Sequence, residues 1–345
     1  MQLHHTFLND LRETFNKATL NSGVIERYFK IGPCEVHMRF ASPELVNKMT
    51  PALEHLEIAK SQNPDLTIFL WDDKTTHSVM QPFPWVDLPS RKQSSITKLL
   101  NTDEIYTTYN AFKRILNVYD ASSQTAFFWV PDARKVPFDE LTSPLQNILH
   151  KFLMLKGAYL VHAGAVGTPR GGILLAGKGG SGKSTSVLSC LNSELFYAAD
   201  NCTLLTGGSN PTAYSLYSSA RLHGQTLWRV PHLIPSVVNR SDLKREKAVM
   251  FLNQMWREKL ISQFPLRAIF LPHVTSSLNT TIVPAKTKDA IHALILSTVV
   301  QLPQTDPHMV QELIKIIHSV PAYHLELGTE MSQIPQVILK FLKES

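Results

Sequence analysis

The chain has 345 residues, of which 43% are hydrophobic and 18% charged, so it is long enough for two globular domains, each with its own core. Its formal net charge of +6 comes from scattered lysines and arginines, which fit an anionic substrate or a solvated face better than nucleic acid. The three cysteines form no C-x-x-C pair, and neither a signal-peptide layout nor a run of about 20 apolar residues is present. We therefore expect a cytoplasmic protein with no nucleic acid or membrane partner.

The first 140 residues read as a small α+β domain without a recognisable catalytic motif. Apolar spacing predicts helices over 3–20 and 43–55, and strands within 27–40 and over 66–71, 115–119 and 126–130. The segment 75–103 is rich in proline and serine and reads as a long surface loop. The adjacent Asp72 and Asp73 are interpreted as a polar strand end rather than a metal site.

Residues 141–345 have a different character, in which short apolar strands and amphipathic helices follow one another. The predicted strands are 158–166 with its turn, 173–176, 195–199, 214–217 and 268–272. The predicted helices are 145–155, 185–191, 290–302, 309–319 and 335–342. We therefore expect an α/β domain here, preceded by the smaller domain of residues 1–140.

The segment from Gly177 to Ser184 matches the phosphate-loop pattern G-x-x-x-x-G-K-[ST] without a mismatch, between a predicted strand and a predicted helix. Its glycines allow successive backbone N–H groups to point into one concavity, where they bind phosphate oxygens. Lys183 would reach the β- and γ-phosphates, and the Ser184 hydroxyl would ligate Mg²⁺. The sequence thus predicts that ATP and Mg²⁺ bind here, with nucleotide contacts from Gly177, Lys178, Gly179, Gly180, Ser181, Gly182, Lys183, Ser184 and Thr185.

A carboxylate follows the next predicted strand. The apolar strand over 195–199 ends in Asp200, and a carboxylate at this place beside a phosphate loop is suited to bind metal or to orient an attacking group. Further polar candidates downstream are Arg221, His223 and Lys247.

Three stretches, 160–166, 177–184 and 199–201, together resemble the HPr serine kinase/phosphorylase family. They are more similar still to bacterial HPr-kinase-like relatives found beside genes that modify peptides or polysaccharides. The resemblance covers residues 145–345 and is supported by 295–298 and 320–328, while residues 1–140 resemble the N-terminal half of those relatives. It implies a P-loop catalytic domain of the HPr kinase/phosphoenolpyruvate carboxykinase type over 141–345.

The resemblance also implies roles for single residues. His162 matches a catalytic-site histidine near the phosphates, Lys183 the phosphate-loop lysine and Ser184 the Mg²⁺ ligand. Asn201 stands where the family has a second aspartate, which is assigned as proton acceptor. Because an amide cannot act as that base, either Asp200 takes over the task or activity is altered. No counterpart of the family's downstream Mg²⁺-binding glutamate is evident, and Arg221 matches the arginine just after it.

These features predict a kinase that transfers the γ-phosphoryl group of ATP to a hydroxyl, with serine of a peptide or protein as the expected acceptor. Two alternatives stay open: a small-molecule or sugar kinase, and a nucleotide-binding regulatory or scaffold protein with weakened catalysis, in which Asn201 marks the lost chemistry. The N-terminal domain is expected to capture the substrate or a leader peptide. The resemblance alone implies a homo-oligomer.

Overall fold

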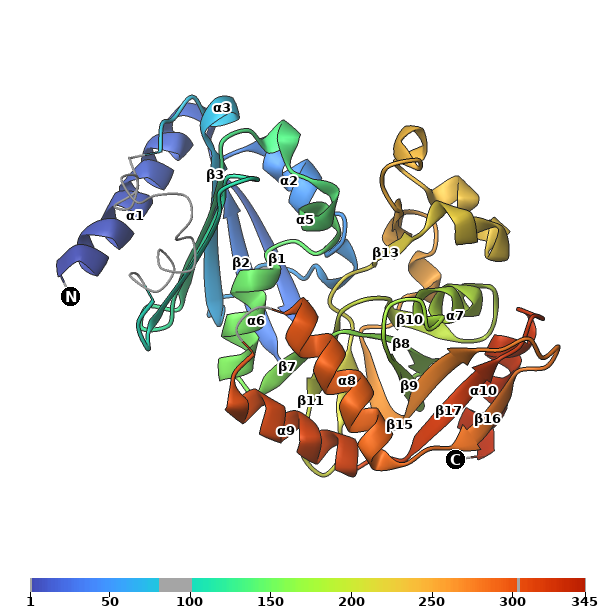
Figure 1. The fold of residues 1–345 in the computed structure, drawn as a ribbon. Coiled ribbons are helices and arrows are strands. Elements are labelled where there is room, and N and C mark those ends of the chain that lie inside the picture. Colours follow the sequence, from blue (N-terminus) through green and yellow to red (C-terminus); the bar gives the residue numbers. More distant parts are fainter. Residues whose placement is uncertain (1, 81–100, 303–304, 345) are drawn as a thin grey trace. The chain divides into compact units, whose positions relative to one another are not determined.

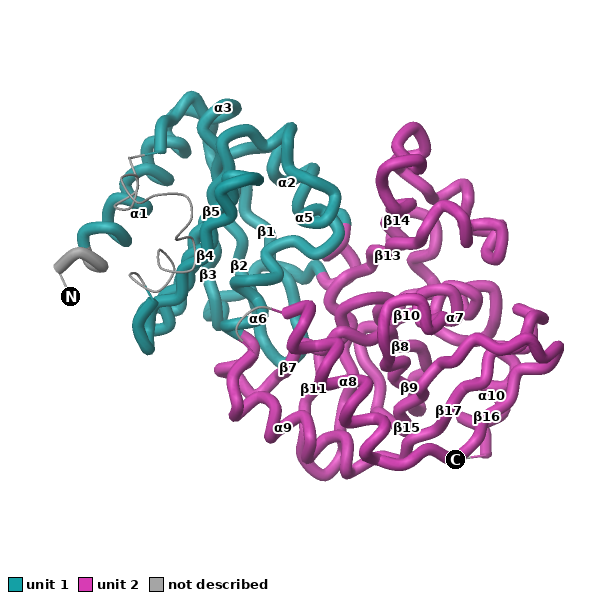
Figure 2. The backbone as a smooth tube through the Cα atoms, viewed as in Figure 1, with its two compact units in different colours: residues 1–51, 57–152 teal, residues 52–56, 153–345 magenta. Residues whose placement is uncertain are grey.

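The computed structural model describes residues 2–80, 101–302 and 305–344, and the chain forms two compact units (Figure 2). Unit 1 consists of residues 1–51 and 57–152, and unit 2 of residues 52–56 and 153–345. The sequence placed the boundary after residue 140, whereas the units divide inside helix α6 (Gln146–Leu155). The first part of this helix packs in unit 1, where the Phe152 ring meets that of Tyr119 edge to face. Most of the loop predicted over 75–103 lies outside the described residues.

Unit 1 is built on a six-stranded mixed sheet in the order β1-β2-β3-β6-β5-β4 (Figure 1). The strands are β1 (Ile25–Ile31), β2 (Cys34–Phe40), β3 (Leu66–Asp72), β4 (Ile105–Asn110), β5 (Ile115–Asp120) and β6 (Thr125–Val130). The central strands β2, β3 and β6 run parallel, and the outer pairs are antiparallel.

Helices cover both faces of this sheet, which explains why β3 is a continuous apolar run. The long α1 (Gln2–Ser22) packs on one face, where its Phe15 ring lies 5.0 Å from that of Phe69. The short helices α2 (Pro43–Met49) and α5 (Phe138–Thr142) cover the other face, and α3 (Asp73–Thr76) follows β3 (Figure 1). The predicted strands and the helix over 3–20 are confirmed in outline, whereas the helix predicted over 43–55 ends at Met49.

Unit 2 contains a nine-stranded sheet whose main path runs β10-β8-β9-β15-β12-β11-β7, with β17 beside β15 and β16 beside β17. The strands are β7 (Ala158–Val161), β8 (Ala163–Thr168), β9 (Gly171–Ala176), β10 (Phe196–Ala199), β11 (Thr203–Thr206), β12 (Thr212–Tyr214), β15 (Gln263–Val274), β16 (Thr281–Pro284) and β17 (Ala322–Leu327). The long β15 joins the two parts of the sheet, because its start pairs with β12 and its remainder lies parallel to β9 and β17.

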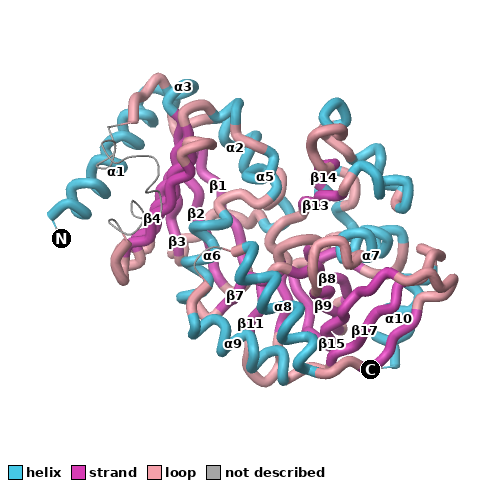
Figure 3. Tube along the Cα trace, in the orientation of Figure 1, coloured by secondary structure: helices cyan, strands magenta, loops and turns pink. Residues whose placement is uncertain are grey.

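Two pairs of helices cover the two faces of this sheet (Figure 3). The helices α7 (Lys183–Ser189) and α10 (Gln333–Glu344) pack on one face, and α8 (Thr287–Gln301) and α9 (Pro307–His318) on the other. Along β9, Ile173 and Leu175 face the first pair, whereas Leu174 and Ala176 face the second. The chain is therefore a mixed α/β protein, as predicted. None of the described helices combines the length and apolarity needed to cross a bilayer.

Two predicted strands differ from the structure. The strand expected over 158–166 is interrupted at His162, since β7 pairs with β11 and β8 pairs with β9 and β10. The strand expected over 214–217 was wrong beyond Tyr214, where β12 ends and the chain turns to bind the segment 52–56. The antiparallel pair β13 (Ser219–Leu222) and β14 (Ala248–Phe251), with several 3-10 turns between them, was not predicted.

The segment 52–56, although early in the chain, belongs to unit 2. The Ser218 N–H donates to the Ala52 carbonyl over 2.8 Å, and the His55 Nε2 atom lies 2.7 Å from the Ser215 hydroxyl oxygen. The His55 Nδ1 atom is buried and has no hydrogen-bond partner among the described residues. Burial therefore favours the neutral imidazole and lowers the pKa of His55 from 6.5 to about 3.

We expect His55 to make the protein sensitive to acid. His55 is protonated near pH 6.5 in the unfolded chain but only near pH 3 in the folded chain. Its contribution to the free energy of unfolding is therefore complete above pH 6.5 and is lost as the pH falls. At about 1.4 kcal/mol per pKa unit, the loss reaches roughly 4 kcal/mol near pH 3. Denaturant unfolding between pH 4 and 8 should show a flatter stability curve for His55→Gln. The exposed-histidine control His308→Gln should follow the wild type, and a His55→Gln curve as steep as the wild type would contradict the assignment.

Candidate functional site

The strands of unit 2 bring several predicted site residues to one edge of the sheet. Strand β8 is antiparallel to both β9 and β10, and β15 and β17 run parallel to β9, so the carboxyl ends of four strands meet there. The phosphate loop follows β9, Asp200 follows β10, and His162 directly precedes β8. Ligands of open α/β sheets bind at such an edge.

The loop between β9 and α7 has the backbone that its glycines predict. Gly180 and Gly182 adopt φ angles of 81° and 102°, which side chains disfavour. A Cβ on Gly182 would also lie 2.3 Å from a methyl carbon of Leu327, so only glycine fits. A Cβ on Gly179 or Gly180 would meet no atom within 4 Å, which shows that this side of the loop is open.

Lys183 opens helix α7 with its side chain turned back over the loop. Lys183 is 7% exposed. Its Nζ atom donates hydrogen bonds to the carbonyl of Gly177 over 2.5 Å and to that of Lys178 over 3.0 Å. Burial lowers the pKa of Lys183, whereas the carboxylate of Asp200 opposes that shift. An ammonium held by two carbonyls in this way is available to anionic oxygens that enter the loop.

Asp200 is the buried carboxylate of the site. It is 2% exposed, and Oδ2 accepts a hydrogen bond from the Arg221 backbone N–H over 3.3 Å. Oδ1 is buried and has no partner in the described structure. Burial raises the pKa of Asp200. The hydroxyl of Ser184, the Arg221 N–H and the charge of Lys183 act in the opposite direction and lower it. A buried oxygen without a donor is costly unless a ligand or metal ion supplies its partner.

His162 lies in the gap between β7 and β8 and is fixed through its backbone. Its N–H donates to the hydroxyl of Thr298 in α8 over 3.1 Å. Burial lowers the pKa of His162 to about 4, and the charges of Lys183 and Lys247 add to the shift, while a hydrogen bond to the Asn201 backbone opposes it. The imidazole is therefore neutral at pH 7.

The unpredicted pair β13 and β14 adds charge to this site. Lys247 directly precedes β14 and is exposed, yet its charge lowers the pKa values of His162, Lys183 and Asp200. Arg221 contributes its backbone N–H to Asp200, and its Nε is buried without a hydrogen-bond partner among the described residues. Two distant sequence positions are thus brought to the phosphate loop.

The remaining predicted residues lie around the loop with different exposure. Lys178 and Asn201 are exposed, and Thr185 is half-buried in the first turn of α7. The Ser181 hydroxyl is buried and has no hydrogen-bond partner among the described residues.

A cavity of about 830 Å³ adjoins the phosphate loop, within the size range of small-molecule sites. One wall is the loop together with His162, and another is the end of β15 from Leu271 to Val274. Helix α8 supplies the apolar side chains of Ala293, Leu296 and Val300. The cavity therefore extends from the glycine-rich loop at one end to apolar side chains at the other.

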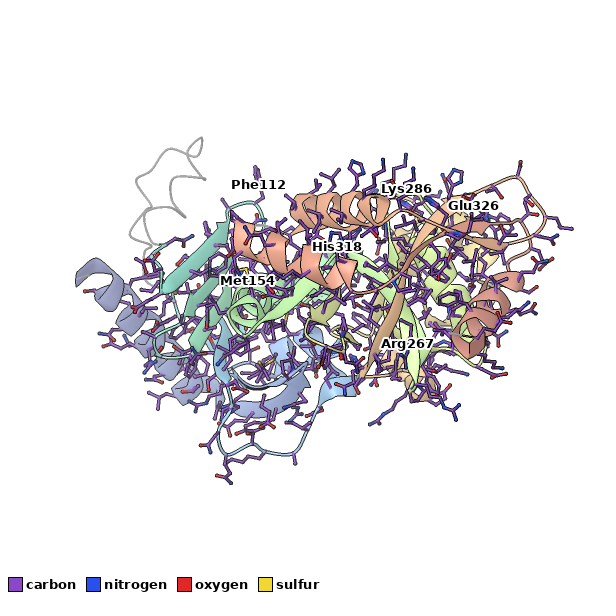
Figure 4. All side chains as sticks on the ribbon, turned by 90° about the horizontal axis from the view of Figure 1, so that it is seen from below. Phe112, Met154, Arg267, Lys286, His318 and Glu326 are labelled. Atoms are coloured by element: carbon purple, nitrogen blue, oxygen red, sulfur yellow. The ribbon has the colours of Figure 1, made fainter. Side chains whose placement is uncertain are left out.

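Two histidine–carboxylate pairs were missed by the sequence analysis, and three of their four side chains line the cavity: His273, His324 and Glu326. The Nδ1 atom of His273 lies 2.9 Å from a carboxylate oxygen of Glu326, which Figure 4 labels, and Nε2 of His324 lies 4.0 Å from one of Asp289. Both pairs span different elements, β15 with β17 and β17 with α8. The only feature of the sequence that could have indicated these pairs is the presence of polar residues near the carboxyl ends of β15 and β17.

The site fits a divalent cation that is held jointly by protein and substrate. The Ser184 hydroxyl and the Asp200 carboxylate are hard oxygen ligands next to each other at the loop. Throughout residues 2–80, 101–302 and 305–344, no group of three or more histidine, cysteine, aspartate or glutamate side chains is placed to hold a metal ion. Mg²⁺ typically binds through one or two protein oxygens together with substrate phosphates, as these two residues would allow.

Comparisons with known proteins add little to this geometry. No family model matches the chain, and no curated protein matches it. Among solved structures, the chain is similar to the HPr(Ser) kinase/phosphatase from Coxiella burnetii, with 10% sequence identity and a TM-score of 0.29. The match covers 54% of this chain and 93% of that chain. At this level of similarity, function rests on the residues of the site.

Proposed function

We propose that this chain is an ATP-dependent kinase of the HPr-kinase type, which transfers the γ-phosphoryl group to a hydroxyl, with serine of a peptide or protein as the acceptor. One observation carries the proposal: a phosphate loop with a buried lysine faces a buried aspartate whose Oδ1 has no partner among the described residues. A loop alone would indicate nucleotide binding, but the additional carboxylate supplies what transfer requires.

The phosphate loop and the adjoining cavity would hold the nucleotide. Lys183 would exchange its two loop carbonyls for phosphate oxygens, and the amides of the open loop would cradle the phosphates. The apolar part of the cavity, on α8, would receive the nucleoside. Mg²⁺ bound by Ser184 and Asp200 would neutralise phosphate charge in the transition state.

Asp200 is the residue best placed to act on the acceptor. Burial raises its pKa, which makes the carboxylate a stronger base than that of an exposed aspartate. In the transfer the acceptor O–H bond breaks and its proton passes to the carboxylate, an O–P bond forms to the γ-phosphorus, and the bond to the leaving ADP oxygen breaks. Asn201 is exposed and cannot take the proton.

His162 and Lys247 would assist without exchanging protons. The neutral His162, whose pKa is about 4, can accept or donate one hydrogen bond near the phosphates but carries no charge at pH 7. Lys247 would add positive potential at the mouth of the site.

The experiment that tests the proposal is mass spectrometry of acceptors after incubation with the full chain and Mg²⁺-ATP. The acceptor set should contain the peptides encoded beside this gene and a separate pool of sugars and small alcohols. We expect a gain of one phosphate on serine of a peptide, dependent on Mg²⁺ and absent with Lys183→Met. Phosphate only in the small-molecule pool would overturn the peptide acceptor, and intact ATP binding with no phosphate anywhere would overturn the kinase itself.

A further inference from the structure

Unit 1 contains a second cavity, of about 570 Å³, which the proposed kinase chemistry does not use. It lies between the turn that joins β4 to β5, the end of β6, the start of α3 and the segment 131–137. Its apolar lining consists of Ile115, Val130, Pro131, Val136 and Pro137.

Basic side chains surround this apolar lining. Lys74, Lys113, Arg114 and Lys135 all contribute to the wall of the cavity and are exposed. Lys113 pairs with Asp139. Among the described residues the other three basic side chains form no ion pair, so they leave the cavity with excess positive charge.

The one acidic side chain in the wall does not cancel this charge. Asp132 is engaged by Arg134, whose Nε and Nη2 donate to its two carboxylate oxygens over 2.8 and 3.0 Å. These hydrogen bonds are the main reason why the pKa of Asp132 is lowered. The carboxylate therefore stays ionised and bound to Arg134. An incoming anion would meet the three unpaired cations rather than this carboxylate.

The turn beside the cavity has a fixed and uncommon conformation. Asn110 Oδ1 accepts the backbone N–H groups of Phe112 and Lys113 over 3.1 and 3.0 Å, and Arg114 adopts a left-handed φ of 54°. A non-glycine residue is strained in this region, and such strain is concentrated at ligand-binding positions. At the tip of the turn Phe112 is 94% exposed, and its side chain extends outward in Figure 4.

We propose that this cavity binds an acidic peptide segment, in which carboxylates face Lys74, Arg114 and Lys135 and apolar side chains contact the proline- and valine-lined wall and Phe112. Charge complementarity carries the choice of occupant: the cations recognise carboxylates, and the apolar wall selects a chain that also carries apolar side chains over a small anion. In the kinase proposed above this segment would belong to the acceptor. The binding itself does not depend on phosphoryl transfer.

Fluorescence anisotropy of the full chain tests the proposal in the absence of ATP, so its outcome is independent of kinase activity. The probe is a short fluorescein-labelled peptide in which glutamate alternates with alanine and leucine. We expect binding that weakens as salt is raised, and about tenfold or greater loss of affinity in the double variant Arg114→Gln, Lys135→Gln. The charge-matched double variant Lys17→Gln, Lys60→Gln, at exposed positions of the same unit, should bind as the wild type does.

Competition identifies the chemistry that is recognised. The same peptide with glutamine in place of glutamate should fail to compete, and inorganic phosphate or succinate should compete only at far higher concentration. Equal competition by these small anions, or tight competition by a single-stranded oligothymidylate, would overturn the peptide assignment. Unchanged affinity in the Arg114→Gln, Lys135→Gln variant, with its melting temperature also unchanged, would overturn the site.

Discussion

Replacing Lys183 by methionine should weaken nucleotide binding by about 30-fold or more, because removal of one partner of a buried charged hydrogen bond costs roughly 2–5 kcal/mol. The Lys183 Nζ atom donates two hydrogen bonds to carbonyls of the loop, so the ammonium lies where phosphate oxygens would replace those carbonyls. Methionine keeps the buried stem of the side chain and removes only the charge. The variant therefore separates the role of the ammonium from that of packing.

The measurement is titration with a fluorescent ATP analogue, together with the rise in melting temperature that ATP and Mg²⁺ produce. A ligand bound only by the folded state stabilises it by an amount that grows with the ratio of ligand concentration to Kd, so the thermal shift should shrink with the affinity. Lys340→Met, on the exposed side of α10, provides the matched control. An unchanged affinity in Lys183→Met would remove the phosphate loop from the nucleotide site.

The conformation of the glycine-rich loop between β9 and α7 could be predicted from the sequence because it is set locally. A run of eight residues sets the glycine φ angles, the lysine and the start of α7, and no distant contact is needed to position them. Asp200 was predictable for a similar reason, since an apolar strand ends directly before it. Most strands and helices around these residues also follow from apolar spacing over short windows.

What the sequence could not predict depends on pairing between distant segments. No local sequence feature indicates that one strand ends and another begins at His162. The interruption arises because β7 pairs with β11 whereas β8 pairs with β9. The sequence named Lys247 as a candidate, but Lys247 precedes β14, and its position near His162 depends on the pairing of β14 with β13. The segment 52–56 and the wall of the larger cavity likewise depend on contacts across the chain, which sequence periodicity does not encode.

Replacing Asp200 by asparagine should lower phosphoryl transfer by about a thousandfold while nucleotide binding changes far less, because general acid–base and metal-ligand functions are lost together. Hydrolysis of ATP, with water as the acceptor, gives a readout that does not require the natural acceptor. The expected pattern is ADP release that depends on Mg²⁺ in the wild type, stops with a chelator, and is absent in the variant. Asp242→Asn, an exposed aspartate of the same unit, should retain the wild-type rate.

The stability of the Asp200→Asn variant distinguishes lost chemistry from lost folding. Burial raises the pKa of Asp200, so this group stabilises the fold most when it is protonated and less as the pH rises through its folded pKa. Asparagine has no charge to desolvate and can still accept the Arg221 N–H, so the variant should melt at the same or a higher temperature at pH 8. A folded variant that binds ATP without turnover would place Asp200 in the reaction, whereas turnover within tenfold of the wild type would show that transfer does not use this carboxylate. A less stable variant would instead mean that Oδ1 already has a structural partner. The proposal that this oxygen binds a ligand or metal ion would then fail.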